Sequence, residues 1–158
     1  MDPTGLSILL TELLADCAVA LDAGRKAATR LGEAAPGHME ACAYELSRFY
    51  NILEKMMERI CEGFENHLDK RSDYHERLIQ RLSLNLEGIR PAFIPHGRIS
   101  DIRELKGFRH LTRHAYDLTL RVDRLTELAE IAAQLAEELP AWCEDFSAKV
   151  RAEQSWGD

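Results

Sequence analysis

Apolar residues recur along this chain at steps of three and four, the spacing of one face of an amphipathic helix. The longest such run alternates these steps for about three heptads over residues 42–64. Its apolar positions are Cys42, Leu46, Phe49, Leu53, Met56, Ile60 and Phe64. No segment alternates apolar and polar residues as a strand does. The pattern therefore predicts helices throughout.

A helix is predicted on each side of this run. The first passes through residues 6–21 and closes at Gly32, before a Pro-Gly turn. The other begins at Asp73, which can form a capping box with Glu76, and extends through Leu86.

Two more helices follow a loop, residues 88–97, that contains two prolines. The first of them can be capped by Asp101 with Glu104. Its predicted buried side consists of Leu105, Phe108, Leu111, Thr112 and Ala115. The last helix begins near Val122 and carries apolar positions as far as Val150. We expect an all-α antiparallel bundle of about five helices, with residues 1–158 forming a single domain.

Composition indicates a soluble globular protein. Hydrophobic residues make up 46% and charged residues 30% of the chain, which excludes disordered and collagen-like classes. No apolar run approaches the ~18–20 residues of a membrane span, and Asp2 stands where a signal peptide would carry Lys or Arg. The four cysteines lack C-x-x-C spacing and are expected to be buried thiols. We expect a cytoplasmic protein with no membrane partner.

Charge is distributed unevenly. The whole chain carries a net charge of −7, yet residues 98–124 hold seven Lys and Arg against four Asp and Glu. A basic segment in an acidic protein is a candidate docking site for an anionic partner. Ordinary charge scatter on a solvated helix face is the competing interpretation.

The chemically specific residues lie on the fourth predicted helix. At about 100° per residue, two arginines, two histidines and one aspartate share an outward strip opposite the buried side. These residues are Arg109, His110, Arg113, His114 and Asp117. Tyr116 falls beside Arg109, at the border of the core.

Three interpretations of the strip compete. It can be a solvated charged face without further function. It can be a metal site, because His110 and His114 are four residues apart and Asp117 follows three later, although Arg109 and Arg113 would repel a divalent cation.

The third interpretation is metal-independent cleavage of a phosphodiester by the substrate's own 2′-hydroxyl. An imidazole moves the proton, and an arginine stabilises the charge that grows on phosphorus. Arg109 and His114 lie about 140° apart around the helix. A two-fold dimer through this helix would duplicate the strip and let the arginine of one subunit meet the histidine of the other.

Residues 109–116 have the form R-x4-H-x-Y, with a polar residue after the arginine and Phe108 before it. This resembles the motif of the HEPN superfamily and, because of the tyrosine, of the HepT-like toxins in particular. Residues 44–50, the long helix after them and the Arg90-Pro91-Ala92 loop are also similar to members of this family. The resemblance covers about residues 40–146 and is less secure for the first helix.

The resemblance implies a dimeric helical bundle that brings two R-x4-H motifs into one cleft. Many such proteins are endoribonucleases that need no metal or other cofactor, and the HepT-like ones are toxins. Each is encoded beside a minimal nucleotidyltransferase antitoxin, which transfers AMP to the tyrosine of the motif. By this resemblance Arg109 is the transition-state cation, His114 the general acid/base and Tyr116 the AMPylation site. His110 would orient the scissile phosphate, and Arg113 would contact RNA because of its place on the strip.

Two alternatives to a ribonuclease toxin stay open: a non-catalytic HEPN subunit that binds the nucleotidyltransferase or a nucleotide, and an unrelated metal-binding bundle. If RNA is the substrate, it can be tRNA or mRNA. Contact is then expected on the side of residues 98–124, and the product is expected to end in a 2′,3′-cyclic phosphate. Elsewhere, Tyr44 and Tyr50 are expected to pack, and Glu45 and Arg48 to form a surface ion pair.

Overall fold

The computed structural model describes residues 1–65, 68–114 and 119–155. Its helices are α1 (Pro3–Gly32), α2 (His38–Phe64), α3 (Tyr74–Leu82), the short 3₁₀ helix η1 (His96–Arg98), α4 (Ile99–His114) and α5 (Val122–Ser155). The described residues contain no strand, and their one β-bridge joins Leu86 to Arg90. The predicted all-α class, with five α-helices, is confirmed.

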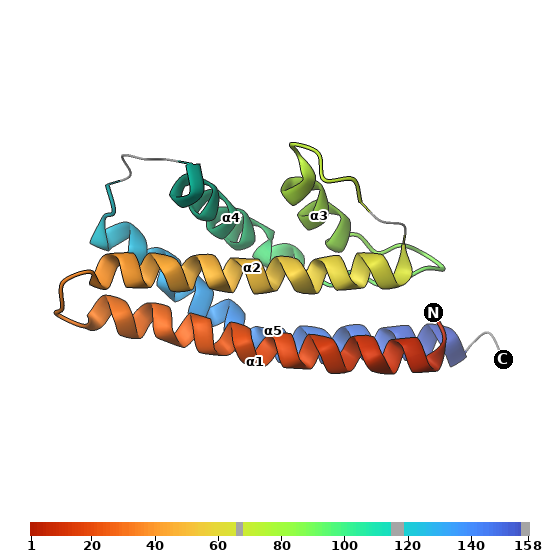
Figure 1. The fold of residues 1–158 in the computed structure, drawn as a ribbon. Coiled ribbons are helices and arrows are strands. Elements are labelled where there is room, and N and C mark those ends of the chain that lie inside the picture. Colours follow the sequence, from red (N-terminus) through yellow and green to blue (C-terminus); the bar gives the residue numbers. More distant parts are fainter. Residues whose placement is uncertain (66–67, 115–118, 156–158) are drawn as a thin grey trace.

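The long helices α1, α2 and α5 run lengthwise beside one another, and α3 and α4 lie on the side of α2 that faces away from α1 (Figure 1). Both α2 and α5 run antiparallel to α1, so that α5 ends near the N-terminus. Gly37, with φ of 79°, makes the reversal between α1 and α2, because this left-handed conformation suits a residue without a Cβ. The predicted antiparallel arrangement is thus observed between α1 and each of the other two long helices, whereas α2 and α5 run parallel to each other.

Alanine and glycine allow α1 and α5 to approach closely. A Cβ added to Gly24 would lie 3.0 Å from the Cβ of Ala136 and 3.1 Å from the carbonyl oxygen of Ala132. Ala20 and Ala23 of α1 are fully buried near the same level of the helix. Larger residues are buried where α1 meets α2, among them Leu13 and, on α2, Phe49 and Leu53. The predicted apolar stripe of α2 is buried, apart from the half-buried Phe64.

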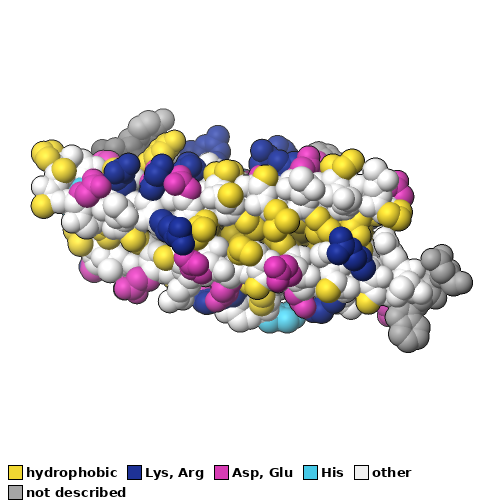
Figure 2. Space-filling view, turned by 90° about the horizontal axis from the view of Figure 1, so that it is seen from below, with side chains coloured by type: hydrophobic (Ala, Val, Ile, Leu, Met, Phe, Trp, Pro, Cys, Tyr) yellow, Lys and Arg dark blue, Asp and Glu magenta, His cyan; other side chains and the backbone are white. Residues whose placement is uncertain are grey.

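In length and composition, α1 could cross a membrane, which corrects the expectation that no apolar segment approaches a span. That criterion is also met by core helices of soluble proteins, and α1 buries Leu6, Leu9 and Leu13 in the core. Its other side exposes large apolar residues, including Ile8 and Leu14. Figure 2 shows the face on which α1 and α5 lie, where hydrophobic side chains run between charged ones.

Two predicted features of α3 are wrong. The helix ends at Leu82 rather than at Leu86. After Leu86 the chain instead reverses direction through Gly88 (φ 74°), and Leu86 pairs with Arg90 in a β-bridge. The capping box does not form, because Asp73 makes no side-chain capping bond and Glu76 binds side chains of α4.

On α4, the carboxylate of Asp101 accepts from Arg98, 2.8 Å away, instead of capping the helix with Glu104. Leu111 was predicted to be buried but is 53% exposed, because the contact of α4 with the core is made by Ile102, Leu105 and Phe108 one to two turns earlier. Ala115 lies outside the described residues.

All four cysteines are buried free thiols, as predicted. Tyr50 is buried, as predicted. Glu45 pairs with Arg48 at 2.7 Å as predicted, but the pair is not on the surface, because Glu45 is buried. Tyr44, in contrast, is 66% exposed and does not pack.

Candidate active site

The second half of α4 carries four of the predicted site residues. Arg109 is half-buried, whereas His110, Arg113 and His114 are exposed. Thr112, on the side of α4 that faces α2, donates its hydroxyl to the carbonyl oxygen of Arg109 at 2.9 Å, and this hydroxyl lies 3.5 Å from that of Ser47. His110, Arg113 and His114 therefore face outward, as the helical angles predict, whereas Arg109 is partly covered.

A cleft of about 320 Å³ lies where α2, α3 and α4 meet. We call it the α3–α4 cleft; it is lined by Tyr50, Ser72, Asp73, His75, Glu76, Lys106, Gly107, Arg109, His110, Arg113 and His114. Arg109 and His114 share this one cleft despite the wide angle between them on the helix. One protomer therefore brings the first and last residues of the R-x4-H motif to the same site.

Among the described residues, the ion pairs in the α3–α4 cleft involve Glu76, Lys106 and Arg103, and not Arg109 or Arg113. The carboxylate of Glu76 binds Lys106 at 2.6 Å and Arg103 at 2.7 Å. Burial opposes ionisation of Glu76, but the hydrogen bonds from these two cations outweigh it and lower the pKa of the carboxyl group. Within the described residues, no carboxylate pairs with Arg109 or Arg113. These guanidinium groups are thus free to bind an anion such as a phosphodiester.

The imidazole rings of His110 and His114 are neighbours on the surface of α4. Their centroids lie 4.5 Å apart, and the ring planes are tilted by 49°. Both side chains line the α3–α4 cleft. Two imidazole groups are therefore available as proton donors or acceptors in the cleft that also holds Arg109.

Tyr50, on α2, lines the base of the α3–α4 cleft. It is only 1% exposed, and its hydroxyl has no hydrogen-bond partner within the described residues. Burial, together with the nearby carboxylate of Glu54, raises the pKa of Tyr50, and the charge of Arg109 acts in the opposite direction. The hydroxyl is therefore a neutral donor, buried at the base of a positively charged site.

The structure adds a histidine that the sequence analysis did not single out. The Nδ1 atom of His75, on α3, lies 2.6 Å from a carboxylate oxygen of Glu54 on α2. The neighbouring Tyr74 donates its hydroxyl proton to Glu58 at 2.6 Å, one turn further along α2. Tyr74 and His75 are adjacent, whereas Glu54 and Glu58 are four residues apart. The sequence carries no signal for this contact, because it does not reveal which face of α2 receives α3.

Two predicted site features are not described. Tyr116 and Asp117 lie outside the described residues, so the AMP acceptor and the third residue of the metal interpretation have no structural account. Among the described residues, no three His, Cys, Asp or Glu side chains are placed to hold a metal ion.

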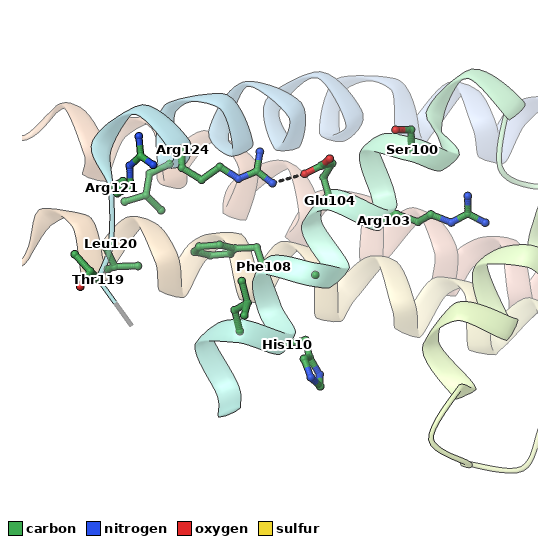
Figure 3. A pocket seen from close by; sticks show the side chains of 12 residues that line it. Ser100, Arg103, Glu104, Phe108, His110, Thr119, Leu120, Arg121 and Arg124 are labelled. Atoms are coloured by element: carbon green, nitrogen blue, oxygen red, sulfur yellow. Dashed lines mark hydrogen bonds and ion pairs between the residues drawn. The ribbon is translucent and has the colours of Figure 1, made fainter. Parts of the chain in front are cut away.

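A second cavity of about 650 Å³ lies on the other side of α4, beside the start of α5. This α4–α5 cleft is lined by Ser100, Arg103, Glu104, Gly107, Phe108, His110, Leu111, Thr119, Leu120, Arg121, Arg124 and Leu125. Figure 3 shows Arg124 reaching across it to Glu104, while Arg103 extends toward α3. His110 lines both cavities, so α4 forms the wall between them.

Comparison with known proteins supports the motif. A family model described as HepT-like protein matches residues 41–150, which include the whole α3–α4 cleft. No curated protein and no solved structure matches the chain. Because the family model covers well over half of its length, the chain belongs to the HepT-like family of the HEPN superfamily. This membership indicates a toxin-like protein of the HEPN type.

Proposed function

We propose that this protein is a metal-independent endoribonuclease toxin that cleaves RNA in the α3–α4 cleft. The observation that carries the proposal is the convergence of Arg109 and His114 on one cleft, with no carboxylate of the described residues neutralising Arg109. Membership in a family whose members are generally ribonuclease toxins supports it.

In the proposed reaction the 2′-hydroxyl of RNA attacks the adjacent phosphorus. The 2′-hydroxyl loses its proton as the O2′–P bond forms, and the leaving O5′ receives a proton as the P–O5′ bond breaks. His114 transfers a proton, and Arg109 stabilises the negative charge on the phosphoryl oxygens by its paired N–H donors. His110 orients the scissile phosphate, and Arg113 contacts the RNA backbone. The products are a 2′,3′-cyclic phosphate and a 5′-hydroxyl.

The active form is proposed to be a homodimer with α4 near the two-fold axis. Leu111, inside the motif, exposes more than half of its surface, which supports this arrangement because an apolar side chain there can be buried by a second copy. The RNA, either tRNA or mRNA, would bind along residues 98–124. A cytoplasmic location accords with such a substrate.

Control of the toxin is proposed to rest on a cognate minimal nucleotidyltransferase that transfers AMP to Tyr116. The adenylate would add bulk and a negative charge beside Arg109 and thereby exclude RNA. Co-expression with the nucleotidyltransferase should add the mass of one adenylate group to the wild type and none to Tyr116→Phe. An adduct of equal yield on Tyr116→Phe would contradict the assignment.

Incubation of purified protein with total RNA in EDTA tests the ribonuclease directly. Wild type should cleave, His114→Ala should not, and His96→Ala should match wild type because His96 is an exposed residue of η1 outside the cleft. Absence of cleavage by unmodified wild type would support the alternative, a non-catalytic HEPN subunit that binds the nucleotidyltransferase or a nucleotide.

A further inference from the structure

The cleavage reaction needs two proton transfers, one from the 2′-hydroxyl and one to the leaving oxygen, and the R-x4-H motif of one protomer assigns only His114 to them. A second imidazole lies across the same cleft. His75 lines it from α3, and its side chain is 41% exposed, which leaves it open to a ligand. No role in the proposed function above uses this residue.

The environment of His75 suits a base. Glu54, whose side chain is only 13% exposed, holds the Nδ1 atom at 2.6 Å. A carboxylate at one ring nitrogen fixes the tautomer, directs the lone pair to Nε2 and stabilises the imidazolium that forms when Nε2 takes a proton. Within the described residues, Nε2 of His75 has no partner. The pair thus has the arrangement of a carboxylate-oriented general base.

Contacts with neighbouring residues hold the His75–Glu54 pair in place. The ring of Tyr74 meets that of His75 edge-on, with centroids 5.5 Å apart, and its hydroxyl is bound to Glu58. Glu76, one residue after His75, binds Lys106 and Arg103 and so ties α3 to α4. The wall that carries His75 is therefore fixed relative to the wall that carries the motif.

We propose that His75, held by Glu54, is the general base for RNA cleavage and acts within the same protomer as His114. The Nε2 atom of His75 takes the proton of the 2′-hydroxyl as the O2′–P bond forms. His114 gives its proton to O5′ as the P–O5′ bond breaks. Glu54 is a positioning residue, since it touches His75 and not the substrate. This inference rests on the ribonuclease function proposed above.

The pH profile of kcat/KM separates the two histidines. A base must be deprotonated and therefore sets the acidic limb, whereas an acid must be protonated and sets the basic limb. His75→Ala should lower kcat/KM by about 10²–10⁴-fold and flatten the acidic limb. His75→Asn, which can still donate to Glu54, should give the same profile, so that a folding defect in the alanine variant does not decide the result.

Other ionisable groups surround His75, and their substitutions can be compared by the same pH profile of kcat/KM. Those that line the cleft are Tyr50, Asp73, Glu76, Lys106, Arg109, His110, Arg113 and His114. Glu54 and Tyr74 contact His75 itself. Glu54→Gln retains an acceptor for Nδ1 but removes the charge, and should shift the acidic limb to lower pH. Glu58→Gln is the matched control, because Glu58 accepts from Tyr74 rather than from His75 and a glutamine oxygen can still accept that bond; it should leave the profile unchanged.

A leaving-group substitution tests the assignment independently. The substrate is an oligoribonucleotide with sulfur in place of the bridging 5′-oxygen at the mapped cleavage position, because a thiolate departs without protonation. His114→Ala should recover activity on this substrate, whereas His75→Ala should stay as impaired as on normal RNA.

The outcomes distinguish the inference from the function on which it rests. If wild type cleaves and His114→Ala does not, while His75→Ala keeps the wild-type rate and acidic limb, the ribonuclease stands and His75 is not its base. Loss of the acidic limb in His110→Ala instead, or rescue of His75→Ala by the sulfur substrate, also overturns the assignment. Failure of unmodified wild type to cleave overturns both proposals.

Discussion

The guanidinium group of Arg90 is completely buried, and its Nε–H donates to the carboxylate of Glu65 at the end of α2. The other nitrogens donate to backbone carbonyl oxygens of Arg81, Leu84 and Pro91, at 3.1, 3.2 and 3.1 Å. One side chain thereby fastens the end of α2, the end of α3 and the following loop together. This loop leads into η1 and α4, so the contact supports the geometry of the α3–α4 cleft.

Arg90→Met should destabilise the protein strongly, because it removes the buried cation from the Glu65 carboxylate, which keeps only Arg81 at 3.3 Å, and leaves three backbone carbonyl oxygens without this donor. Removing one member of a buried ion pair costs about 3–5 kcal/mol. The free energy of unfolding from urea titration measures the loss. Arg25→Met is the control, since it breaks an exposed pair with Glu137 and should cost less than about 1 kcal/mol. Equal losses in the two variants would contradict a structural role for Arg90.

Stability should fall at alkaline pH through two buried thiols. Burial raises the pKa of Cys42 and of Cys61 to about 11. Both are neutral in the folded and unfolded chains below pH ~8.5; above it the unfolded thiols ionise first, so unfolding releases protons. The free energy of unfolding therefore falls as the pH rises from about 8.5 toward 11. The slope of unfolding free energy against pH should be shallower in a Cys42→Ala/Cys61→Ala variant, and an unchanged slope would refute the assignment.

Glu76→Gln should strengthen RNA binding at low salt. The substitution removes the charge that now neutralises Lys106 and Arg103 beside the cleft. Two cations released toward a single strand would steepen the slope of log K against log salt by up to about 1.4. Fluorescence anisotropy of a labelled oligoribonucleotide at several salt concentrations measures it.

The matched control for Glu76→Gln is Glu137→Gln. It releases Arg25, which pairs with α5 from the α1 side of the molecule, and should leave RNA binding unchanged. A comparable gain in both variants would mean that RNA responds to overall charge rather than to the side of residues 98–124.

Leu111→Glu should convert the proposed dimer into monomers. Leu111 is 53% exposed on α4 beside His110, and a charge at a buried apolar contact between subunits is strongly unfavourable. Light scattering coupled to size-exclusion chromatography gives the mass in solution. Leu84→Glu, which charges an equally exposed leucine outside α4, should remain dimeric. A monomeric wild type, or dissociation by both substitutions, would contradict an interface at α4.

The helices were predictable because each carries a regular apolar face over several turns. Periodicity located α2 and the outward strip of α4, since both depend only on angles within one helix. The C-terminus of α3 was missed because Leu86 continues the helical spacing, although it pairs with Arg90 across a glycine turn. Leu111 was placed on the wrong side because the neighbours of α4 cover a narrower face than the apolar pattern suggests.

Contacts between helices account for what the sequence did not reveal in the site. His75 and Glu54 are 21 residues apart and meet only because α3 docks on one particular face of α2. Arg90 is charged and lies in a predicted loop, so nothing local indicates that it is fully buried. Arg109 and His114 were expected on one strip, but their shared cleft exists only because α3 supplies the opposite wall.

The central claim is that His114 and Arg109 cleave RNA through the 2′-hydroxyl without a metal ion. The most direct measurement is the mass of the 3′ end produced from a single oligoribonucleotide in EDTA by unmodified wild type, beside His114→Ala and an identical substrate with one 2′-deoxy sugar at the cleavage position. The account predicts a 2′,3′-cyclic phosphate from wild type, and no cut by His114→Ala or at the deoxy sugar. A 3′-hydroxyl product, or cleavage at the deoxy position, would contradict it.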